Sequence, residues 1–121
     1  MFQLLFVLVL IGVLQYLNAA VTIRQYVEKP EEFAKEEGCY IPELNKVLPY
    51  GESESPIASD SCSKYHCHND NTTTIEICGS VGYDKQKCTL VADYTQAYPC
   101  CCGTLTCDGK SINVGGKDCR T

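Results

Sequence analysis

The sequence has no tryptophan and only three phenylalanines, two of which lie within the first six residues. Between residues 21 and 121, leucine, isoleucine, valine and phenylalanine together number seventeen. That share is below the ~20% at which a charged chain begins to look disordered. So few apolar side chains bury too little surface to offset chain entropy comfortably. Some other interaction must therefore stabilise the fold.

The sequence also lacks a cluster of basic residues. It carries ten Lys and Arg against fifteen Asp and Glu, a net charge of −5, and glutamates are frequent between residues 28 and 54. Binding to phosphate groups requires a basic surface. We therefore expect neither a nucleic-acid partner nor an anionic membrane partner. The glutamates are interpreted as a solvated face that keeps the protein soluble.

A long apolar run occurs only at the N-terminus. Residues 4–14 are almost entirely apolar, and small residues follow at Ala19 and Ala20, although no Lys or Arg precedes the run. This pattern is typical of a secretory signal peptide. The run is shorter than the roughly 20 apolar residues of a membrane-spanning helix. We expect a signal peptide over residues 1–20, cleaved after Ala19 or Ala20, and a secreted, extracellular protein without membrane insertion.

Cysteine is the residue that the sequence has in excess. All ten cysteines follow residue 38, and an even number at this density in a short exported chain is typical of a disulfide framework. Five bridges at roughly 2–4 kcal/mol each would replace much of the missing core. Spacing alone does not select among the possible pairings. The cysteines are Cys39, Cys62, Cys67, Cys78, Cys88, Cys100, Cys101, Cys102, Cys107 and Cys119.

Two extended segments surround a tight turn in the middle of the chain. Residues 63–68 (SKYHCH) and 72–78 (TTTIEIC) flank the turn-forming sequence NDN, and Ile75 and Ile77 alternate with polar residues. Residues 89–94 (TLVADY) form a third candidate strand. Together these segments predict a small, disulfide-rich fold of mainly short antiparallel β-strands.

The remaining segments are assigned by composition. Residues 49–61 are rich in turn formers and are expected to form an exposed loop. Residues 21–38 form an acidic arm, expected to be either flexible or a short helix after Pro30. One domain is expected over residues 39–107, and residues 108–121 form a tail tied back to it.

Metal binding and catalysis are two other interpretations of the cysteines and histidines. Three adjacent thiols suggest zinc binding, but adjacent cysteines rarely bind one tetrahedral ion. The sequence also lacks the usual zinc-site pattern, in which two pairs of ligands are each separated by two to four residues. His66 and His68 share one face of their expected strand, whereas Cys67 points to the other. Some disulfide-rich phospholipases have a His-Asp pair after adjacent cysteines, but here residues 103–106 (GTLT) follow. We expect no metal, no cofactor and no catalytic residue.

One modification site is recognisable in the sequence. Asn71, Thr72 and Thr73 form an N-glycosylation sequon within the expected turn. A glycan on Asn71 would make the tip of that hairpin more soluble and shield it from contact.

At the end of the domain, Pro99 and one more residue precede the pair Cys101 and Cys102, and Cys107 follows after four further positions. This pattern resembles the closing signature of single-domain von Willebrand factor type C proteins. The upstream cysteines occur in the order of that family, so the resemblance covers about residues 38–107. Gly103 departs from the family's usual proline, and Cys100 and Cys119 lie outside its eight cysteines.

The resemblance implies a disulfide pairing. By analogy with type C domains, the pairs are Cys39–Cys67, Cys62–Cys101, Cys78–Cys102 and Cys88–Cys107. An additional pair accounts for both extra cysteines, and we predict that Cys100 bridges Cys119. That bridge would close a loop of about twenty residues and contribute roughly 3 kcal/mol.

The resemblance also implies a function. Type C modules generally bind other proteins, so a monomeric, non-enzymatic protein that binds an extracellular protein or receptor is expected. The family is common in arthropods and includes the Vago-like proteins of insect antiviral and stress responses, together with venom and salivary peptides. Immune or stress signalling is therefore one expected role. The other is a venom or salivary effector, including a protease or channel inhibitor, that presents Leu90, Tyr94 and Tyr98.

Overall fold

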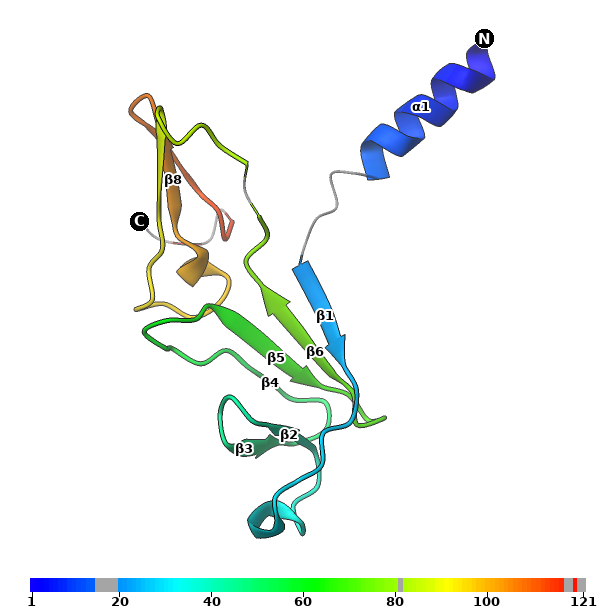
Figure 1. The fold of residues 1–121 in the computed structure, drawn as a ribbon, viewed down its shortest axis with the longest axis vertical. Coiled ribbons are helices and arrows are strands. Elements are labelled where there is room, and N and C mark those ends of the chain that lie inside the picture. The colour runs from blue at the N-terminus through cyan, green and yellow to red at the C-terminus, as the bar shows by residue number, and fades with distance from the viewer. Residues whose placement is uncertain (15–19, 81, 117–118, 120–121) are drawn as a thin grey trace.

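The computed structural model describes residues 1–14, 20–80, 82–116 and 119 (Figure 1). The N-terminal apolar run forms helix α1 (Phe2–Leu14), and its large side chains up to Val9 are exposed. Within the described residues, no helix is long and apolar enough to span a membrane. The expected cleavage position after Ala19 lies outside the described residues, whereas Ala20 is described.

A four-stranded antiparallel sheet forms the middle of the structure. Its strand order is β1-β6-β5-β4 (Figure 1). The hairpin predicted from the alternating pattern is confirmed as β5 and β6, and the His68 amide donates to the Thr72 carbonyl across the turn at 2.9 Å. The strands are β1 (Ala20–Arg24), β4 (Ser53–Glu54), β5 (Ser63–Cys67) and β6 (Thr73–Ile77).

Strand β1 shows that the N-terminal arm begins as part of the sheet. It pairs with β6 from Ala20 opposite Ile77 to Arg24 opposite Thr73, a pairing that the sequence pattern does not predict. Arg24 also forms an ion pair with Glu43, which lowers the pKa of the Glu43 carboxyl chiefly through the hydrogen bond. The expected helix after Pro30 is present as a single 3₁₀ turn, η1 (Glu31–Phe33).

A second hairpin carries most of the small core. Strands β2 (Cys39–Ile41) and β3 (Lys46–Leu48) pair in antiparallel fashion, although no strand is predicted there from the sequence. Ile41 and Leu48 pack with Tyr65 of β5, and the Cys39–Cys67 bridge lies within the same buried cluster. The core is as small as the composition predicts, because few apolar side chains are available for it.

A three-stranded antiparallel sheet forms the C-terminal part. It has the order β7-β8-β9, and Leu105 is its buried apolar side chain. The two-residue turn from β8 to β9 contains Asp108 and Gly109, both at positive φ (48° and 75°), as a type I′ turn requires. The strands are β7 (Cys88–Val91), β8 (Thr104–Cys107) and β9 (Lys110–Asn113).

Five disulfides connect these parts, and all ten cysteines are described, with none free. Two of the bridges join residues next to the four-stranded sheet to the short 3₁₀ helix η2 (Cys100–Cys102), and another lies across β7 and β8. Four of the pairs coincide with those that the resemblance implies, and the fifth, Cys100–Cys119, coincides with the additional pair predicted for the two extra cysteines. They are Cys39–Cys67, Cys62–Cys101, Cys78–Cys102, Cys88–Cys107 and Cys100–Cys119.

Candidate functional site

The three adjacent cysteines of η2 have three different partners. Cys100 bridges Cys119, Cys101 bridges Cys62, and Cys102 bridges Cys78. The sulfur atoms of Cys62, Cys78 and Cys102 lie within 4.8 Å of one another, but each belongs to a disulfide. Because the metal-binding and nucleophilic form of cysteine is the free thiolate, these sulfurs can serve neither role while oxidised. Their contribution is to hold η2 in place.

The histidines contact hydroxyl groups and each other. His66 Nδ1 lies 2.6 Å from the hydroxyl of Ser53, and the His66 and His68 rings meet edge to face with centroids 4.6 Å apart. A nucleophile and base of the hydrolase type also require a third group that orients the base. Among the described residues, no carboxylate forms a hydrogen bond with either ring. The Ser53–His66 contact therefore lacks that orienting group.

The segment between β7 and η2, residues 92–99, is the connection that presents side chains at the surface. Asp93 organises it, because its carboxylate accepts hydrogen bonds from the Thr95 amide at 3.1 Å, the Thr95 hydroxyl and the Gln96 side chain. These hydrogen bonds, that of the Thr95 hydroxyl first, lower the pKa of Asp93. The Asp93 amide donates in turn to the Cys101 carbonyl at 3.2 Å. The loop is thus held at both ends.

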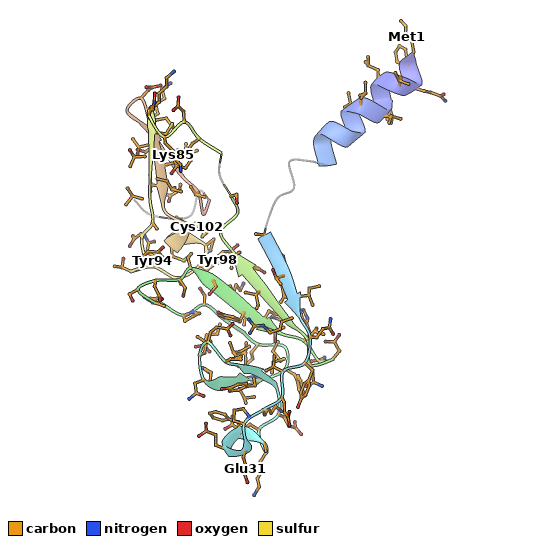
Figure 2. All side chains as sticks on the ribbon, viewed as in Figure 1. Met1, Glu31, Lys85, Tyr94, Tyr98 and Cys102 are labelled. Carbon is orange, nitrogen blue, oxygen red and sulfur yellow. A yellow bond between two sulfur atoms is a disulfide. The ribbon has the colours of Figure 1, made fainter. Side chains whose placement is uncertain are left out.

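The three side chains expected on this surface have different surroundings. Tyr94 is 40% exposed and Leu90 is 36% exposed. Tyr98 is only partly exposed, and burial followed by the charge of Glu76 raises the pKa of its hydroxyl. Its amide donates to the Ser55 hydroxyl at 2.7 Å. Figure 2 shows Tyr94 at the outer edge and Tyr98 closer to the four-stranded sheet. Tyr98 therefore anchors the loop, whereas Tyr94 and Leu90 are available for contact.

A concave pocket of about 460 Å³ adjoins the same loop. It lies on the face of the C-terminal sheet that carries the side chains of Thr104, Ser111 and Asn113. Val91, the register partner of Thr104, lies on the same face, and Asp93 lines the pocket beyond the end of β7. The loop and this pocket form one candidate surface, in which an exposed aromatic ring lies beside a hollow that is lined by both apolar and polar groups.

Comparison with known proteins establishes the family. Residues 39–107 match the family described as single domain von Willebrand factor type C. The chain belongs to this family. The match begins at Cys39 in β2 and ends at Cys107 in β8, so the resemblance predicted from the cysteine pattern is confirmed. Strands β1 and β9 lie outside the match.

This type C protein is also similar to U-megalopygitoxin(1)-Mo1 from Megalopyge opercularis. The two chains are 32% identical over 89 residues. The alignment covers 74% of this chain and 84% of the relative. Most of the relative's length is therefore represented in this type C protein.

The structure explains one departure from the family pattern. Where type C proteins usually have a proline after the cysteine pair, Gly103 adopts φ +92°. Proline is restricted to φ near −65° and cannot adopt that conformation. A β-carbon on Gly103 would also lie 2.0 Å from the Val91 carbonyl oxygen. Close contact between β7 and the start of β8 therefore depends on glycine at this position.

The residues that hold the loop are not among those that the sequence pattern selects. Asp93 and Thr95 have the spacing of an Asx turn, in which a carboxylate accepts from the amide two residues later. That signal is present in the sequence Asp-Tyr-Thr. Ser55 carries no such signal, because its partner Tyr98 lies forty-three positions away.

Proposed function

We propose that this type C protein is a secreted, non-enzymatic monomer that binds another protein outside the cell. Five disulfides support export, because such bridges persist in oxidising compartments and are rare in the cytosol. The N-terminal apolar helix has the character of a signal peptide, to be removed after Ala19 or Ala20.

The observation that carries the proposal is the rigid loop that exposes Tyr94. Asp93 and two disulfide-bonded cysteines, Cys100 and Cys101, restrain the loop before any partner arrives. A partner therefore meets an aromatic side chain whose backbone has little entropy left to lose. Tyrosine is enriched among the residues that dominate binding energy in protein interfaces. The adjoining pocket provides polar groups near the same side chain.

Two biological settings are compatible with this binding role. Immune or stress signalling in an arthropod is the first, supported by the family resemblance. A venom or salivary effector, such as a protease or channel inhibitor, is the second. The name of the relative from Megalopyge opercularis identifies that protein as a toxin and favours this alternative. Transcripts restricted to a venom or salivary gland would support the effector, whereas induction in haemocytes or fat body would support signalling.

The binding role is tested with the secreted protein, fluorescently labelled and titrated onto haemocytes, gut membranes and extracellular fractions. Saturable binding is expected, and Tyr94→Ala should weaken it about 30-fold, as loss of a hot-spot residue does. Tyr26→Ala is the matched control, because Tyr26 is also exposed (59%) but lies outside the loop. Absence of saturable binding, or equal weakening by both variants, would contradict the proposal.

A further inference from the structure

The two histidines lie together on the outer face of the four-stranded sheet. The side chains of Tyr65 and Cys67 alternate with His66 and face the core, where both are buried. His66 and His68 are half-exposed on the opposite face, and their ring centroids are 4.6 Å apart. No other histidine occurs in the sequence.

Each ring uses one nitrogen to contact a hydroxyl group on a neighbouring strand. Nδ1 of His66 forms a hydrogen bond with Ser53 of β4, and Nε2 of His68 forms one with Thr74 of β6 at 2.5 Å. Among the described residues, Nε2 of His66 and Nδ1 of His68 have no hydrogen-bond partner. Such an arrangement is usual for metal-binding histidines, in which the second nitrogen is held by a neighbouring group that orients the ring.

We propose that His66 and His68 bind a divalent transition-metal ion of the class that prefers imidazole ligands, Zn²⁺ or Cu²⁺. The ligands are Nε2 of His66 and Nδ1 of His68, with water in the remaining positions. This site differs from the cysteine cluster, whose sulfurs are oxidised. It is also independent of the Tyr94 loop and of the protein-binding role. Among common divalent ions, Cu²⁺ should bind more tightly than Zn²⁺.

The spacing of the rings fits one ion. Metal–nitrogen bonds of about 2.0–2.1 Å at angles between roughly 90° and 109° place two imidazole centroids roughly 4.5–5.2 Å apart. The observed separation of 4.6 Å falls within that interval. The χ2 angle of histidine is soft, so small rotations that retain the hydroxyl contacts of Ser53 and Thr74 can adjust the direction of the two other nitrogens without a change in the backbone.

Charged side chains of both signs lie on or next to this outer face. Lys64 and Glu76 are opposite each other in the register of β5 and β6, so their charges compensate. Asp70 follows His68 by two positions, and its carboxylate accepts hydrogen bonds from the amide and the hydroxyl of Thr72, which places a negative charge in the turn after β5.

The proposal is tested by calorimetric titration of the secreted protein with ZnCl₂ and separately with CuCl₂, together with NMR of the histidine ring protons. One bound ion per chain is expected, with the ring signals of both histidines shifted by Zn²⁺ and broadened by Cu²⁺. His66→Gln and His68→Gln should each weaken Zn²⁺ binding at least tenfold, and the double variant should abolish it. Ser53→Ala, which removes an orienting hydroxyl, should weaken it about tenfold.

Glu37→Gln is the matched control, since Glu37 is exposed and distant in sequence from both strands, and it should leave the affinity unchanged. Thermal melting of each variant verifies that the fold is retained. Zn²⁺ affinity that is unchanged in the double variant would place the ion elsewhere and overturn the proposal. Histidine signals that remain unmoved at millimolar Zn²⁺ would overturn it as well.

Discussion

Gly103 faces the carbonyl group of Val91 so closely that a β-carbon on Gly103 would lie 2.0 Å from the carbonyl oxygen. The contact joins the end of β7 to the residue that precedes β8. The amide of Val114 donates to the Gly103 carbonyl at 2.9 Å, which brings the segment after β9 to the same point. One glycine therefore lies where three segments of the C-terminal part converge.

Gly103→Ala should lower the free energy of unfolding by more than about 3 kcal/mol, because the strained backbone alone costs about 1–3 kcal/mol and the Val91 carbonyl must also move. Gly109→Ala is the control, because Gly109 has φ +75° and a β-carbon added to it would meet no atom within 4 Å. It should cost only about 1 kcal/mol, the strain of positive φ. Urea unfolding of the disulfide-intact proteins provides the measurement. Equal losses for the two variants would argue against the close contact.

Removal of the Cys100–Cys119 bridge should destabilise the protein without disturbing the other four pairs. The double variant Cys100→Ser/Cys119→Ser is expected to lose about 3 kcal/mol, because a bridge spanning 19 positions restricts the unfolded chain by that amount. Denaturant unfolding measures the loss. Partial proteolysis with mass spectrometry of the parent protein provides the control, and a peptide that links Cys100 to any residue other than Cys119 would exclude this pairing.

Strand β1 should stabilise the mature protein. A chain that begins at Ala20 is expected to be roughly 1–3 kcal/mol more stable than one that begins at Gln25, since the shorter chain loses the cross-strand pairs with β6 and the Arg24–Glu43 ion pair. Arg24→Ala in the longer chain isolates the ion pair, which is partly exposed and should contribute less than about 1 kcal/mol. Matching melting temperatures for the two chain lengths would show that β1 does not pair in solution.

The Tyr94 loop should loosen in acid. The pKa of Asp93 is depressed in the folded protein, so its stabilising effect is complete above the ordinary aspartate value of ~3.9 and is lost as the pH falls through the lower folded value. Hydrogen exchange of the Thr95 amide should therefore become faster, relative to the base rate at each pH, below about pH 4. In Asp93→Asn this dependence should disappear. An unchanged pH profile in that variant would assign the effect to another group.

Asn71 should carry a glycan when the protein is made in a eukaryotic secretory pathway. It lies in the turn between β5 and β6 at φ 66°, where its side-chain oxygen accepts a hydrogen bond from the Tyr50 hydroxyl. Treatment with a peptide-N-glycosidase should reduce the mass of the secreted protein. Asn71→Gln should abolish the shift, whereas Asn69→Gln in the same turn should retain it. A parent protein of unmodified mass would refute the assignment.

Parts of the fold can be predicted because their signals are local. The β5–β6 hairpin follows from Ile75 and Ile77 alternating with polar residues around a turn-forming triplet. Asp108 and Gly109 form an equally strong turn signal, which predicts the β8–β9 hairpin when it is read together with the flanking residues. Assigning residues 108–121 to a tail by composition overlooks this hairpin. Assigning residues 21–38 to an acidic arm likewise overlooks β1, because its partner strand begins about fifty positions later and the local pattern does not show that pairing.

By itself, the sequence determined that this protein depends on disulfides, because ten cysteines accompany too few apolar side chains to form a large core. It also determined the family, because the order and spacing of the cysteines are properties of the sequence and do not depend on the fold. Only the tertiary structure decided which side chains the Tyr94 loop exposes, that Gly103 must lack a side chain, and that each of the two histidines uses one ring nitrogen to contact a hydroxyl group on a neighbouring strand. The reason is physical: each of these features depends on contacts between residues that are distant in sequence, such as Tyr98 with Ser55 and Gly103 with Val91.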